Sequence, residues 1–108
     1  MKPLLQSSIN KAVQSLVIAL RPNRVYLFGS CAMDSTTSLS DIDLLVVVPD
    51  GVGDKLNNTR EAYLATRDIP FAKDIIVDHE SVFNKRSKWI SSIEREVLES
   101  GKQVYGGS

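Results

Sequence analysis

The chain has 108 residues, of which 43% are hydrophobic and 24% charged; these values predict one globular domain over residues 1–108 and exclude a disordered chain. The 13 basic side chains balance the 13 acidic ones, which excludes a broad basic surface for nucleic acid. The single cysteine, Cys31, excludes a disulfide framework and favours a reducing cytoplasm. The apolar runs are too short to predict a membrane span, and the polar N-terminus predicts no signal peptide.

The first half of the chain predicts one helix and two strands. Apolar residues recur every three or four positions over residues 5–20, which predicts an amphipathic helix. Val25–Phe28 is a β-favouring run that stops at Gly29, and the small, polar residues 31–40 predict a short helical turn and a loop. Asp41–Val48 predicts a second strand, and its unbroken apolar half predicts a central position in a sheet.

The second half predicts two further helices and one or two strands. Residues 54–67 and 88–100 have helical patterns, Phe71–Val77 predicts a third strand, and Lys102–Tyr105 predicts an edge strand. The helix residues expected to face the core are Leu56, Ala62, Tyr63, Arg67, Trp89, Ile93, Val97 and Leu98. We therefore expect an α/β or α+β fold, with a small mixed sheet of three to four strands flanked by helices.

Gly29 and Ser30 form a turn directly after a predicted strand. A glycine lets a phosphate approach the backbone, and a serine hydroxyl and free N–H groups can bind its oxygens. The alternative is a turn glycine followed by a serine that caps a helix. On its own this short motif favours the structural interpretation.

Three carboxylates stand on or beside the predicted strands. Asp41 and Asp43 are two residues apart, so on a strand their side chains point to the same face. If the third strand pairs beside this one, Asp74 can join them. Neighbouring carboxylates repel unless a cation neutralises them, and convergent carboxylates suit a two-metal site. The alternative is solvated carboxylates at the start of the second strand, with Asp74 on an exposed face and paired to Lys73 or an arginine.

The combined pattern resembles a known family. Leu27–Ser30, nine further residues and then Ser40–Val46 are similar to the signature of DNA polymerase beta-type nucleotidyltransferases, and the short chain resembles the minimal nucleotidyltransferases of that superfamily. The resemblance extends from the first helix to the terminal strand. It implies nucleotide contacts from Gly29, Ser30 and Ser40, and metal-binding and catalytic roles for Asp41, Asp43 and Asp74.

The resemblance also implies a reaction and a partner. We expect AMP transfer from ATP, or from another nucleoside triphosphate, to an acceptor hydroxyl, with two Mg²⁺ ions or alternatively Mn²⁺. Minimal members often act as antitoxins to a small helical toxin of the HEPN type, so we expect such a partner or a homodimer. Trp89 and Ile93 share one helical stripe and are the expected contact.

One segment departs from the family pattern. Cys31–Asp34 stands where relatives often carry arginines and a glycine, so cations that would bind the triphosphate are missing. This departure favours one alternative, a catalytically weakened antitoxin that acts by covering its toxin. A separate alternative is an enzyme that adenylylates a small molecule such as an antibiotic, although such acceptors normally need an extra lobe.

The remaining polar candidates favour structural roles. His79 lies between two acidic residues after the third strand, but no second histidine exists to build a metal site. The basic residues Lys85, Arg86 and Lys88 predict a solvated helix start, with a partner or nucleic-acid contact as the alternative. We interpret Cys31 as a packing residue.

Overall fold

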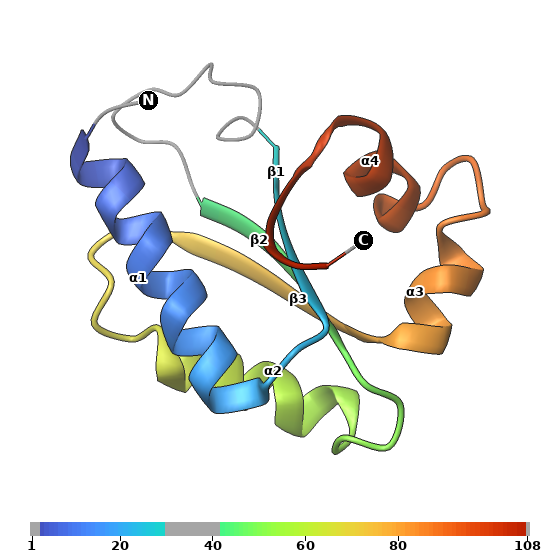
Figure 1. The fold of residues 1–108 in the computed structure, drawn as a ribbon, viewed down its shortest axis with the longest axis horizontal. Helices are drawn as coiled ribbons and strands as arrows, with labels where there is room; N and C mark the ends of the chain where they lie inside the picture. Colours follow the sequence, from blue (N-terminus) through green and yellow to red (C-terminus); the bar gives the residue numbers. More distant parts are fainter. Residues whose placement is uncertain (1–2, 30–41, 108) are drawn as a thin grey trace.

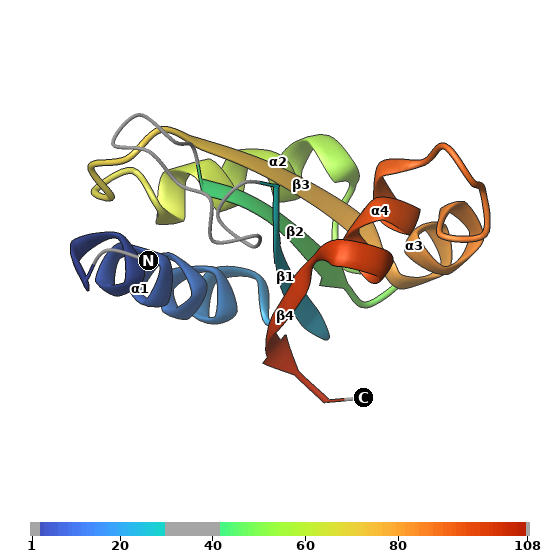
Figure 2. The ribbon, with the colours of Figure 1, turned by 90° about the horizontal axis from the view of Figure 1, so that it is seen from above.

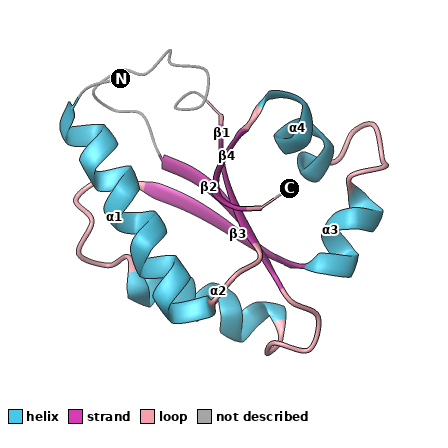
Figure 3. Cartoon of the chain, viewed as in Figure 1, coloured by secondary structure: helices cyan, strands magenta, loops and turns pink. Residues whose placement is uncertain are grey.

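The computed structural model describes residues 3–29 and 42–107. They form a mixed α/β fold of four helices and four strands (Figure 3), which confirms the predicted class. In chain order the elements are α1 (Pro3–Leu20), β1 (Arg24–Phe28), β2 (Ile42–Val48), α2 (Lys55–Ala65), β3 (Lys73–His79), α3 (Glu80–Arg86), α4 (Ile93–Ser100) and β4 (Lys102–Gly106). Within these described ranges, no helix is long and apolar enough to span a membrane.

The four strands form one sheet in the order β3-β2-β1-β4. β1 is antiparallel to both β2 and β4, whereas β2 and β3 are parallel. A parallel pair needs a crossover connection, and α2 provides it. β2 is an interior strand with six of its seven residues buried, which confirms the position predicted from its apolar run.

Helices cover both faces of the sheet, with α1 and α2 on one face and α3 and α4 on the other (Figures 1 and 2). Alternate strand residues divide between these two cores, because successive side chains point to opposite faces. Leu44 and Val46 of β2 pack on the α1 side, whereas Leu45 and Val47 pack on the α4 side. The smaller second core consists of Tyr26, Phe28, Leu45, Val47, Phe83 and Val97.

The predicted periodicity is correct for α1 and only partly correct for α2. In α1 the buried positions include Leu5, Ile9, Ala12, Leu16 and Leu20. In α2 Ala62 is buried as expected, but Leu56, Tyr63 and Arg67, which follows the helix, are exposed. Asn58 takes the buried place instead, since its amide donates to the Val52 carbonyl at 2.7 Å. A polar contact with the preceding loop therefore sets which face of α2 is buried.

The helix predicted over residues 88–100 is correct only in its second part, Ile93–Ser100, and the sequence pattern does not predict α3. α3 begins directly after β3, and α4 begins only at Ile93, because Ser92 caps it by accepting a hydrogen bond from the Arg95 N–H. The Ser92 hydroxyl also donates to the Arg86 carbonyl, which ties the end of α3 to the start of α4. Trp89, Ile93 and Leu98 are consequently exposed by 36% or more, and of the expected set for this helix Val97 alone is buried.

The basic residues expected to start a helix instead end one. Lys85 and Arg86 lie in the last turn of α3, where the helix dipole favours positive charge. The Arg86 guanidinium also donates to a Glu94 carboxylate oxygen at 3.0 Å and lies 5.0 Å from the centre of the Trp89 ring. Lys88 follows the helix and is exposed. Arg86 is therefore part of the contact between α3 and α4.

A buried pair of acidic side chains joins α4 to β3. The Asp78 carboxyl accepts from the Lys55 ammonium through Oδ1 at 3.0 Å, while its buried Oδ2 has no donor among the described residues. Burial raises the pKa of Asp78 to about 6, helped by the neighbouring Glu94 and opposed by Lys55. Burial alone would raise the pKa of Glu94, but hydrogen bonds with Asp78 and Arg86 hold it below its usual value. A protonated Asp78 thus donates a hydrogen bond to the ionised Glu94 carboxylate.

This pair gives stability a pH dependence. The pKa of folded Asp78 exceeds its ordinary value of 3.8, so the folded state binds more protons than the unfolded state between about pH 4 and pH 6. The stabilisation is complete below that window and is lost as pH rises through about 6. Asp78→Asn mimics the neutral carboxyl at every pH. We therefore expect the fall in unfolding free energy with rising pH to be about 1–2 kcal/mol smaller in this variant. Urea unfolding at pH 4.5 and 6.5 measures the fall in unfolding free energy between the two pH values. An equal fall in Asp78→Asn and the wild type would contradict the prediction. Asp68→Asn, at an exposed carboxylate, is the control and should behave as the wild type does.

Candidate active site

Two of the predicted site carboxylates lie on adjacent strands. Asp43 of β2 and Asp74 of β3 are register partners in the parallel pair. Paired residues of neighbouring strands are about 4.8 Å apart and point to the same face. Asp43 is half-buried and Asp74 is exposed. The expected pairing of the third strand beside the second is therefore confirmed, and it places both carboxylates side by side on one face of the sheet.

Gly29 lies directly against the Asp43 carboxylate. β1 and β2 pair antiparallel with Phe28 opposite Asp43, so Gly29 is the first residue beyond the ladder. A Cβ built on Gly29 would stand 2.3 Å from Asp43 Oδ2, and the Gly29 φ angle is +73°. The positive φ angle favours glycine, and a side chain at this position would displace the Asp43 carboxylate. The missing side chain of Gly29 leaves the space that the Asp43 carboxylate occupies.

The other predicted site residues lie outside the described ranges. These are Ser30, Ser40 and Asp41, together with the departing segment Cys31–Asp34. Among the described residues, no group of three or more His, Cys, Asp or Glu side chains is placed to hold a metal ion. The structure thus places Gly29, Asp43 and Asp74 together, and the other three site residues remain predictions from the sequence.

His79 has a structural contact in place of a metal-binding one. Its Nε2 lies 2.9 Å from both the Val52 and the Gly53 carbonyl oxygens. The ring therefore holds the turn between β2 and α2 against the end of β3. This agrees with the interpretation of His79 as a strand-end residue.

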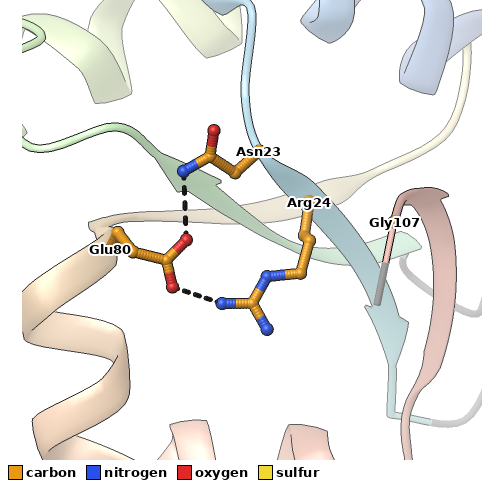
Figure 4. A pocket seen from close by; sticks show the side chains of 4 residues that line it. All are labelled: Asn23, Arg24, Glu80 and Gly107. Carbon is orange, nitrogen blue, oxygen red and sulfur yellow. Dashed lines mark hydrogen bonds and ion pairs between the residues drawn. The ribbon is translucent and has the colours of Figure 1, made fainter.

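A polar hollow at the far end of β1 does not belong to the carboxylate site. Asn23, Arg24, Glu80 and Gly107 line it (Figure 4). Both Asn23 and Arg24 donate to the Glu80 carboxylate, and the guanidinium lies 5.1 Å from the centre of the Phe83 ring. The Glu80 carboxylate thus already neutralises the Arg24 charge. Arg24 is the first residue of β1, whereas Gly29 follows its last residue, so the hollow and the carboxylate site lie at opposite ends of the strand.

Solved structures share this fold. A candidate nucleotidyltransferase from Sulfolobus solfataricus superposes with a TM-score of 0.62 at 19% identity, covering 98% of this chain and 89% of the other. A toxin–antitoxin complex with AMP-PNP has a TM-score of 0.61 at 21% identity, covering 92% and 73%. A mutant of the toxin–antitoxin pair MntA-HpeT gives 0.58 at 19% identity with the same coverage. The sheet and its helices therefore form a nucleotidyltransferase fold.

The sequence assigns the family. Residues 7–104 match the nucleotidyltransferase domain family. A relative from Methanocaldococcus jannaschii, named as a candidate protein adenylyltransferase, is 35% identical over 101 residues, covering 88% of this chain and 96% of the relative. The chain belongs to the nucleotidyltransferase domain family and is an enzyme of nucleotidyltransferase type, as the strand–Gly-Ser and Asp-x-Asp pattern predicts.

Proposed function

We propose that the protein transfers AMP from ATP to a hydroxyl group of a protein acceptor, using Asp41, Asp43 and Asp74. The observation that carries this proposal is the pairing of Asp43 with Asp74 beside Gly29. The name of the M. jannaschii relative supports an adenylyl group and a protein acceptor.

The proposed roles follow from the chemistry of these residues. Carboxylate oxygens are the donors that Mg²⁺ and Mn²⁺ prefer, so Asp41, Asp43 and Asp74 fit two such ions. When bound, these ions neutralise charge on the phosphate oxygens. Gly29 leaves room for the triphosphate at the backbone, and Ser30 and Ser40 supply hydroxyl donors to its oxygens.

The reaction balances as a displacement at the α-phosphorus. The acceptor oxygen forms a bond to this phosphorus, the bond to the β-phosphate bridging oxygen breaks, and pyrophosphate leaves. Asp74 is the more exposed of the two described carboxylates, so the acceptor hydroxyl can approach it from solvent. We assign Asp74 to accept the hydroxyl proton as the new bond forms.

The proposed biological setting is a cytoplasmic toxin–antitoxin pair. Two structural neighbours are toxin–antitoxin structures, one with AMP-PNP, which supports a protein partner that receives the AMP. We propose a small helical partner of the HEPN type, with a homodimer as the alternative source of the acceptor. Trp89 remains exposed by 48% beside the helix pair, so it is available for such a contact.

A transfer assay tests the proposed activity. The purified chain is incubated with ATP, Mg²⁺ and the protein encoded beside it, and the neighbour is then weighed by mass spectrometry. We expect a mass increase of one AMP that requires ATP and metal and is lost in Asp74→Asn. Complex formation without a mass change would instead support the covering antitoxin that the Cys31–Asp34 departure suggests. Adenylylation of a small hydroxyl compound alone would support the antibiotic-modifying alternative.

A further inference from the structure

Tyr63 joins α2 to the strand that carries Asp74. Its hydroxyl oxygen accepts a hydrogen bond from the Ile75 N–H at 3.0 Å. β3 is the outer strand of the sheet and pairs only with β2 among the described strands. The tyrosine hydroxyl therefore binds an edge N–H group that no strand of the sheet reaches.

The peptide that donates this hydrogen bond is attached directly to Asp74. The Ile75 nitrogen belongs to the planar unit that begins at the Asp74 Cα atom. Holding this N–H fixes the plane of the unit and hence one of the two backbone torsions at Asp74. The direction of the Asp74 side chain follows from those torsions, so the Tyr63 hydroxyl acts on it through one rigid group.

A second side chain holds the backbone before Asp74. The Lys73 ammonium donates to the Ile69 carbonyl at 3.2 Å and lies 3.5 Å from the Phe71 carbonyl. These contacts hold the loop that leads into β3. Two contacts thus hold the backbone around the exposed Asp74. Lys73 binds the loop before it, and Tyr63 binds the N–H of the peptide that follows it.

We propose that Tyr63 is a positioning residue for Asp74, an inference that rests on the function proposed above. Mg²⁺ demands a nearly ideal octahedral arrangement of oxygen ligands, so a carboxylate held in one direction binds it better than one on a fraying edge. Loss of one hydrogen bond changes an equilibrium constant by about two- to tenfold. The loss should appear as a higher metal requirement for transfer.

The test compares Tyr63→Phe with a matched variant. Tyr63→Phe deletes only the hydroxyl, and Tyr105→Phe makes the same change on β4, at a hydroxyl with no hydrogen-bond partner in the described part of the chain. The transfer rate is measured as a function of Mg²⁺ concentration. We expect Tyr63→Phe to raise the half-saturating Mg²⁺ concentration about three- to tenfold, and Tyr105→Phe to leave it unchanged.

Two further measurements separate the possible failures. If Asp74→Asn abolishes transfer but Tyr63→Phe has the wild-type metal response, the positioning role is wrong while the proposed function stands. If Asp74→Asn transfers AMP at the wild-type rate, the role of Asp74 itself is wrong. Amide hydrogen exchange of Ile75 in the wild-type protein decides independently of how the variants fold: exchange as fast as in an exposed loop would overturn the proposal, and slow exchange would support it.

Discussion

Asp43→Asn is expected to lower the transfer rate by at least about 1,000-fold, equivalent to about 4 kcal/mol of transition-state stabilisation. Asp43 lies between Gly29 and Asp74, so in the proposed site it contacts both the phosphate end and the acceptor end. An amide keeps the shape but removes the negative charge that holds a divalent cation. Steady-state transfer with ATP and Mg²⁺ measures the effect.

The same variant should fold normally. Asp43 and Asp74 are register partners, so the amide removes the repulsion between two neighbouring carboxylates, and the variant should keep its fold without metal. ATP with Mg²⁺ should raise the melting temperature of the wild type more than that of Asp43→Asn, because only a ligand that binds the folded state stabilises it. Wild-type turnover in Asp43→Asn would remove this residue from the site, and Asp68→Asn, at an exposed carboxylate, is the control.

Gly29→Ala is the second substitution with a large expected effect. The new Cβ would stand 2.3 Å from Asp43 Oδ2, so the carboxylate must move, and the φ angle of +73° is unfavourable for alanine. We expect a loss of about 1–2 kcal/mol of stability from the backbone and at least a 100-fold loss of transfer from the displaced carboxylate. Urea unfolding and the transfer assay measure the two effects separately.

Gly51→Ala is the matched control for this substitution. Gly51 also has a positive φ angle, +92°, but a Cβ there would meet nothing within 4 Å. It should therefore lower stability through the backbone alone and leave transfer unchanged. If both variants retain full transfer, the contact between Gly29 and Asp43 has no functional role.

Local patterns predict most of this fold because they report burial directly. The periodicity of α1 and the apolar run of β2 identify which residues meet the core, and these elements lie where the patterns predict them. The carboxylate pair could be predicted only conditionally, because Asp74 joins Asp43 only if the third strand pairs beside the second. The register that sets Asp43 opposite Asp74 is visible only in the folded sheet.

The failures of sequence reasoning involve polar contacts between distant residues. Ser92 makes the last helix begin at Ile93, five residues later than predicted, by capping α4 and binding the Arg86 carbonyl, and an isolated serine in a polar stretch gives no such signal. Tyr63 is expected to turn an apolar ring inward, yet the ring is exposed and its hydroxyl accepts a hydrogen bond from the Ile75 N–H of β3. In both cases the decisive partner is a backbone group, and backbone groups are the same in every sequence.

The antiparallel pairing of β1 with β2 determines where Gly29 lies relative to Asp43. Phe28 is paired with Asp43, so strand hydrogen bonds, rather than the residues joining the strands, hold Gly29 against the carboxylate. The position of Gly29 relative to Asp43 is therefore set within the described sheet. A substitution that weakens the pairing of Phe28 with Asp43 should therefore disturb the site even though neither backbone group contacts a substrate.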